Sequence, residues 1–144
     1  MESKLLFIDT ETTGLDPKKH GVIQVGMIYG RQELSFNVNP LPLGVKVDKE
    51  ASEINGMKKK HIKKFPDHKE QFSKMTQFLG KFVNQFNPKD KYTVVGYNVK
   101  FDVEFLHGWA EREGFVYMGS YLDWRVIDVL VLARTAHYLG QMPD

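Results

Sequence analysis

The chain has 144 residues, 42% of them hydrophobic, which suits one domain with a single core. Its formal net charge of +2 permits nucleic acid as a partner without requiring it. The absence of cysteine excludes disulfides and thiolate sites, so we expect any metal to be bound through oxygen. No apolar run approaches the ~20 residues of a membrane span, and residues 5–8 are too short for a signal-peptide core. We therefore expect a soluble, cytoplasmic protein without a membrane partner.

The first half of the chain predicts a strand, a hairpin and short helices. Residues 5–8 form an apolar run that ends in acids, which predicts a strand buried on both faces. Turn residues occupy positions 12–17. Segments 22–29 and 34–38 are rich in β-forming residues and predict a hairpin. Residues 51–64 are polar and rich in lysine, which favours short helices at most.

The second half predicts alternating helices and strands. Residues 68–86 carry one helical stripe of apolar side chains, made of Phe72, Met75, Leu79, Phe82, Val83 and Phe86. Segments 92–97 and 124–127 read as strands, and helices are predicted over 99–113 and 128–139. This order predicts an α/β domain with a mixed sheet and helices packed on its faces.

Two acids occupy the end of the first strand. Side chains alternate along a strand, so Asp9 and Glu11 point to one side and Thr10 to the other. Such a pair repels itself unless solvent, protonation or a divalent cation intervenes. For an isolated pair of this kind, a solvated strand end is the simpler interpretation.

A third acid, Asp102, changes that interpretation. Its neighbours on the same helix face are Phe105, Leu106 and Trp109, so it heads the stripe that faces the core. A carboxylate there is costly unless it is paired, hydrogen-bonded by the amides of the first helical turn, or bound to metal. Three acids from two elements predict an oxygen site suited to Mg²⁺ or Mn²⁺. Two such ions could activate a water and stabilise the leaving oxygen of a phosphodiester.

These acids lie in segments that resemble a known family. Residues 7–17, FIDTETTGLDP, resemble the first motif of the DnaQ-like, DEDD 3′→5′ exonuclease superfamily, and residues 95–102, VGYNVKFD, resemble its second. Residues 50–57 resemble the segment beside the substrate terminus, and 127–134 resemble the segment that follows the second motif. The style of the first motif indicates the DEDDh subclass, as in the exonuclease domain of the DNA polymerase III epsilon type.

The resemblance implies a ribonuclease H-like exonuclease fold, which the order of elements suits without singling it out. It implies two-metal hydrolysis at DNA or RNA 3′ ends, with Asp9, Glu11 and Asp102 as the ligands of Mg²⁺ or Mn²⁺. The substrate-binding residues that it implies are Thr12, Thr13, Leu15, Asn55, Asn98 and Phe101. The family commonly has histidine where this chain has Asn55. Plainer roles for the others are a turn, a helix N-cap at Asn98 and core filling at Phe101.

The superfamily's last motif is not found. It carries an aspartate preceded, four or five residues earlier, by a histidine or tyrosine that helps to deprotonate the attacking water. No histidine of this chain has an aspartate five residues later, and no tyrosine has one four residues later. Asp128 is predicted to cap the following helix instead of serving as the fourth ligand. We therefore expect residues 1–144 to form one exonuclease domain that is incomplete at its C-terminus and weak or inactive.

A second class of function stays open. A non-catalytic nucleic-acid-binding or interaction module, derived from an exonuclease core, would also fit. The lysine run at residues 58–64 offers either phosphate contacts or a plain solvated face. The expected partner is a single-stranded DNA or RNA 3′ end, and a DNA polymerase is a further candidate. The sequence does not distinguish DNA from RNA, or proofreading and repair from trimming.

Overall fold

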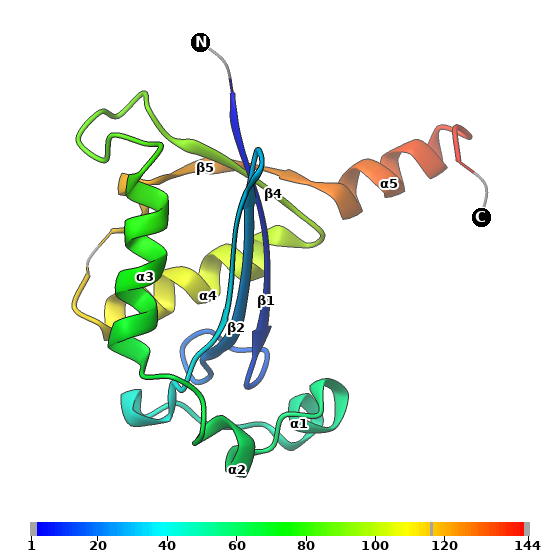
Figure 1. Ribbon diagram of the computed structural model, residues 1–144. Coiled ribbons are helices and arrows are strands. Elements are labelled where there is room, and N and C mark those ends of the chain that lie inside the picture. Colours follow the sequence, from blue (N-terminus) through cyan, green and yellow to red (C-terminus); the bar gives the residue numbers. More distant parts are fainter. Residues whose placement is uncertain (1–2, 116, 143–144) are drawn as a thin grey trace.

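The computed structural model describes residues 3–115 and 117–142, which contain a five-stranded sheet of order β3-β2-β1-β4-β5 (Figure 1). The first three strands pair antiparallel, and β4 and β5 extend the sheet in parallel to β1. The mixed sheet is therefore confirmed, as is the predicted hairpin. The strands are β1 (Lys4–Thr12), β2 (Val22–Tyr29), β3 (Gln32–Asn37), β4 (Tyr92–Gly96) and β5 (Leu122–Asp128).

The two longest helices cover one face of this sheet. They contact each other through the rings of Phe72 and Trp109, whose centroids are 5.3 Å apart. The short helices α1 and α2 lie beyond the carboxyl end of β1, and α5 extends away from the sheet (Figure 1). The helices are α1 (Lys49–Asn55), α2 (Lys59–Ile62), α3 (His68–Gly80), α4 (Val99–Arg112) and α5 (Val129–Tyr138), with 3-10 turns at Leu41–Leu43 and Met118–Ser120.

Strand β1 has one buried face and one partly exposed face. Leu6 and Ile8 belong to the core cluster beneath α3 and α4. Leu5 and Phe7 point the other way and are 37% and 48% exposed. The prediction of a strand buried on both faces is therefore wrong, because α3 and α4 pack on the same side of the sheet. Asp9 lies on the open side.

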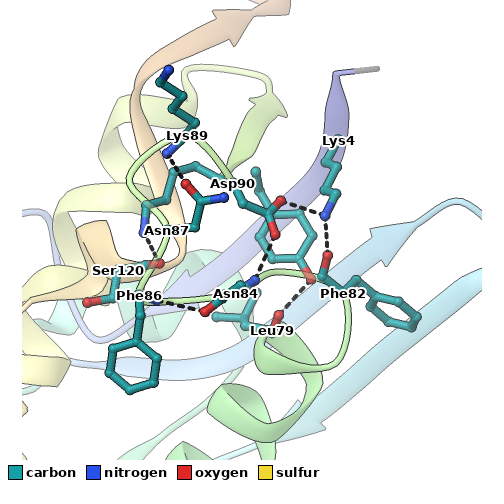
Figure 2. A network of polar contacts seen from close by, with 11 residues as sticks. Lys4, Leu79, Phe82, Asn84, Phe86, Asn87, Lys89, Asp90 and Ser120 are labelled. Carbon is teal, nitrogen blue, oxygen red and sulfur yellow. Dashed lines mark hydrogen bonds and ion pairs between the residues drawn. The ribbon is translucent and has the colours of Figure 1, made fainter. Parts of the chain in front are cut away.

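Helix α3 ends at Gly80, six residues before its predicted end. The following loop is held by polar contacts in place of helical ones: Asn84 donates its backbone N–H to Asp90 at 2.8 Å, and Lys4 pairs with Asp90 at 2.6 Å (Figure 2). The Asn84 amide and Lys4 together lower the pKa of Asp90. The apolar spacing that continues to Phe86 is therefore misleading, since Phe86 is 85% exposed.

Behind the sheet, a buried polar cluster joins α3 to the end of α4. Glu113 Oε1 lies 2.5 Å from His68 Nδ1 and accepts a 3.0 Å hydrogen bond from Trp109 Nε1. The His68 and Glu113 side chains are 10% and 6% exposed. One carboxylate therefore satisfies two buried nitrogens.

Replacing Glu113 by alanine should destabilise the fold, because it leaves two buried polar groups without an acceptor. At about 1–3 kcal/mol for each of the two unsatisfied groups, we expect a loss of roughly 2–6 kcal/mol in the free energy of unfolding. Urea titration followed by circular dichroism measures it. The exposed neighbour Glu111 provides the control, and Glu111→Ala should change stability by less than about 0.5 kcal/mol. Equal losses in both variants would show that the cluster does not stabilise the fold.

Candidate active site

An acidic pair marks the carboxyl end of β1. Asp9 and Glu11 are on the same side of the strand, where Asp9 is exposed and Glu11 is half-buried. Burial raises the pKa of Glu11, and the nearby charge of Asp9 raises it further. A bound cation would relieve this strain on the charged form.

Asp102 occupies the first turn of α4 and is only 4% exposed. Its Oδ1 accepts two hydrogen bonds from Thr10, at 2.9 Å from the backbone N–H and at 2.6 Å from Oγ1. Thr10 lies beyond Phe7↔Val95, the last residue pair between β1 and β4, so its N–H is available for the carboxylate. Burial raises the pKa of Asp102, the bonds from Thr10 oppose this rise, and Asp9 adds to it.

The three acids are neighbours, but they do not converge as the residues stand. Asp9 acts electrostatically on both Glu11 and Asp102. Asp102, however, is bonded to Thr10, whose side chain faces the buried side of β1, while Asp9 and Glu11 face the other side. Within residues 3–115 and 117–142, no three His, Cys, Asp or Glu side chains are grouped closely enough to hold a metal ion. The three-acid ligand set stays a prediction.

The threonines after the acidic pair stabilise the turn that they form. Thr13 is 1% exposed. Its Oγ1 donates to the Lys46 carbonyl at 2.6 Å and accepts from the Gly21 N–H at 2.9 Å, and its own N–H donates to the Gly21 carbonyl at 2.8 Å. Thr12 Oγ1 donates to the Gly14 carbonyl at 2.7 Å. These contacts support the turn interpretation, and a role in substrate binding is untested.

Leu15 and Asn55 also lie near the carboxyl end of β1, but their surroundings differ. Leu15 is 76% exposed, so its side chain is available to a ligand. Asn55 Nδ2 donates to the Thr12 carbonyl at 3.1 Å, and Asn55 Oδ1 accepts from the Met57 N–H at 2.9 Å. Asn55 therefore attaches α1 to the end of β1.

Asn98 and Asp128 meet where β4 and β5 end. Asn98 stands at the N-cap of α4 in the left-handed conformation, with φ 52°, and its side chain makes no capping hydrogen bond. The predicted N-cap position is therefore confirmed, but the Asn98 side chain does not do the capping. Asp128 Oδ1 accepts from the N–H of Asn98 at 2.9 Å and from that of Leu130 at 3.0 Å, which confirms Asp128 as the cap of α5. Phe101 is half-buried, with its ring centroid 4.7 Å from that of Phe105.

Comparison with solved structures identifies the class of fold. The chain superposes on Exonuclease I of E. coli in complex with a 5cy-dA13 oligonucleotide with a TM-score of 0.69, at 20% identity over 96% of this chain and 30% of that one. The zinc-bound form of the Exonuclease I–ssDNA complex gives a TM-score of 0.70 at 19% identity, with the same coverage. The fold is therefore the ribonuclease H-like fold of an exonuclease, as predicted.

The family follows from the sequence comparisons. The exonuclease family model, RNase_T, matches residues 6–143, and the chain belongs to this family. It is 27% identical over 138 residues to a PolC-type DNA polymerase III of Thermotoga maritima, covering 93% of this chain and 9% of that protein. It is 26% identical over 141 residues to ribonuclease T of Hahella chejuensis, covering 90% of this chain and 63% of that protein.

One further expectation concerns the membrane. Across the described residues, no helix has the length and apolar character needed to span a bilayer.

The raised pKa of Asp102 predicts a pH dependence of stability. A carboxyl whose pKa is higher in the folded state stabilises the fold below about pH 4, and this contribution is lost as pH rises through the folded pKa. Asp102→Asn keeps an oxygen acceptor for Thr10 and removes the charge. Its Tm relative to the unsubstituted protein should therefore increase between about pH 4 and pH 7.

Thermal melts at several pH values measure this difference. Glu70→Gln, at an exposed acid on α3, is the control for the removal of one carboxylate. A constant difference for Asp102→Asn would mean that Asp102 ionises as easily in the folded chain as in the unfolded one.

Proposed function

We propose that this chain is the core of a metal-dependent 3′→5′ exonuclease that removes nucleotides from single-stranded DNA or RNA ends. One observation carries the proposal: in a chain of the exonuclease family, an acidic pair at the edge of the sheet adjoins a buried carboxylate whose pKa is raised. Buried acids with perturbed pKa values are typical of functional sites.

The ligands of Mg²⁺ or Mn²⁺ would be Asp9, Glu11 and Asp102. Their donors are all carboxylate oxygens, which these ions prefer. Burial raises the pKa of both Glu11 and Asp102, and a neighbouring cation would favour their charged forms. Both hydrogen bonds from Thr10 use Oδ1 of Asp102, so Oδ2 is the oxygen that a cation could share. Two bound metal ions would supply an activated water and would stabilise the charge on the leaving oxygen.

Turnover by this chain should be slow. Asp128, the fourth acid near the edge, already accepts hydrogen bonds from two backbone N–H groups, and the sequence supplies no histidine or tyrosine at the family's spacing for a general base. General-base catalysis contributes about 10²- to 10⁴-fold in rate. Leu15, which is 76% exposed, would pack on the terminal base.

The relatives support a proposal for the substrate class. A ribonuclease and a PolC-type DNA polymerase are both similar to this chain, so we propose both single-stranded DNA and single-stranded RNA as substrates. A polymerase context would imply proofreading, and a free enzyme would imply trimming. A non-catalytic end-binding module is the second candidate, favoured by the lack of a three-acid cluster among the described residues.

Metal binding and nuclease activity should depend on the acids at the carboxyl end of β1 and on Asp102. Mn²⁺ titration by calorimetry should show binding that Asp9→Asn weakens at least about tenfold, because a carboxylate ligand is lost. The exposed acid Glu70, on α3, supplies the control variant Glu70→Gln, which should bind Mn²⁺ as the unsubstituted chain does.

A labelled oligonucleotide then separates the enzyme from the module. With Mn²⁺, the chain should slowly shorten a strand from its 3′ end, EDTA should stop this, and Asp102→Ala should reduce the rate about 10²-fold or more. Activity that survives Asp102→Ala would indicate a contaminating nuclease. Tight end binding without any shortening would favour the module.

The lysine run should contribute phosphate contacts. Lys58, Lys59 and Lys60 are exposed at α2, which lies beyond the acidic end of β1 (Figure 1). Each lost contact to a single strand lowers the slope of log affinity against log salt by about 0.7, so replacing all three by alanine should lower it by roughly 2.

A matched triple variant on another surface controls for charge alone. Alanine at the exposed residues Lys69, Lys74 and Lys81 should change the salt slope much less. Equal slopes for the two triple variants would mean that the lysine run makes no specific phosphate contacts and is a solvated face.

A further inference from the structure

A depression beside α4, whose wall begins at Val103, is bordered by exposed aromatic side chains. It has a volume of about 470 Å³ and lies between the α3–β4 loop, α4 and the start of β5. Trp124, Phe86 and Tyr117 line it and are 87%, 85% and 65% exposed. Val103 and His107 of α4 complete its wall. Exposed apolar side chains gathered in one patch are typical of ligand-binding grooves and interaction sites.

The loop that presents Phe86 is held in place by polar contacts. The Phe86 N–H donates to Asn84 Oδ1 at 3.1 Å, and the Asn84 N–H donates in turn to Asp90, the partner of Lys4. Lys91 Nζ, at the end of the loop, contacts the Ser120 carbonyl. Figure 2 shows the Phe86 ring directed away from these contacts. The ring is therefore exposed on an ordered loop, which lowers the entropic cost of binding.

Trp124 is presented by an irregularity in β5. Between the pairs Tyr92↔Leu122 and Val94↔Val126, one residue of β4 faces three of β5, residues 123–125. Such bulges redirect a side chain away from the regular pleat. The Arg125 guanidinium lies 5.7 Å from the centroid of the Trp124 ring and pairs with Asp123 at 2.8 Å, so the ring is held beside a fixed cation.

The size and chemistry of the depression indicate its ligand. A volume of about 470 Å³ is that of a small-molecule site, within the usual range of about 300–1,000 Å³, and is unlike a flat protein interface. Exposed aromatic faces beside basic side chains, here Lys91 and Arg125, are the stacking platforms of proteins that bind single strands. The wall residue Val103 directly follows Asp102, so α4 connects the depression to the acidic edge.

We propose that this depression is a second binding site for single-stranded nucleic acid, in which a base upstream of the 3′ end stacks on Trp124 and Phe86. The inference rests on the substrate class proposed above. It adds a contact outside the set of metal ligands, which would favour strands long enough to reach along α4 over short ones.

Trp124 is itself the probe for this site. The other tryptophan, Trp109, is 3% exposed, so a change in fluorescence on binding reports on Trp124. An oligothymidylate of about 12 nucleotides, added in EDTA to prevent cleavage, should quench the fluorescence. Fluorescence anisotropy of the labelled strand gives the affinities of the variants.

Trp124→Ala should weaken binding about 5- to 150-fold, which corresponds to the loss of one stacked base. Trp124→Phe keeps a stacking ring and should stay within about threefold of the unsubstituted chain. Tyr138→Ala removes an equally exposed aromatic, 89% exposed on α5, and should have no effect. Circular dichroism of each variant checks the fold.

Unchanged affinity in Trp124→Ala, or no quenching, would overturn the inference. So would a change in molar mass by light scattering without a change in affinity, because the depression would then be a protein interface. The proposed function fails separately, when Asp9→Asn leaves Mn²⁺ binding unchanged. Because the strand titration contains no metal and the Mn²⁺ titration contains no strand, the two failures are distinguishable.

Discussion

The hydrogen bonds from Thr10 to Asp102 connect the strand that carries the acidic pair to the helix behind it. Burying a carboxylate costs several kcal/mol. Two bonds to a charged acceptor return about 1.5–3 kcal/mol each, and the N-terminal amides of α4 add to them. Because these terms are of similar size, the carboxylate is retained in the fold with its pKa raised. The cost is tolerable only while β1 and α4 keep their relative position.

Local patterns predicted most of the fold and failed where a distant group intervened. The hairpin and the buried stripe of α4 follow from side-chain periodicity, and both are present. The stripe of α3 continues in sequence to Phe86, but the Asn84 amide bonds to Asp90, which Lys4 holds from the other end of the chain. The exposure of Phe7 likewise depends on both large helices packing on one face, which no window of sequence reveals.

In the candidate site, too, local patterns predicted some features, and contacts with distant residues determine the others. The strand period placed Asp9 and Glu11 together, and the helix period placed Asp102 at the head of a buried stripe. The anchoring role of Thr10 was not predicted, because its partner is 92 positions away. A threonine between two strand acids is the one signal that could have suggested it, since its side chain must face the core. Thr13 was named as a turn and substrate-binding residue, but its partner was not predicted for a similar reason, as its hydroxyl bonds to the Lys46 carbonyl 33 positions on.

The position of Asp102 is also set from the carboxyl end of β4. A side chain at Gly96 would bring its Cβ to 2.9 Å from the Ile8 carbonyl, so only glycine lets β4 approach β1 this closely before turning. Asn98 completes the turn and is the one non-glycine residue with positive φ in the described chain, a conformation that costs about 1–3 kcal/mol. Its N–H bonds to Asp128, the residue that also starts α5. The strained turn is thus held by the neighbouring strand, and it directs the first turn of α4 back toward Thr10. A buried acid can therefore lie beside an exposed acidic pair because the backbone on both sides of it is fixed.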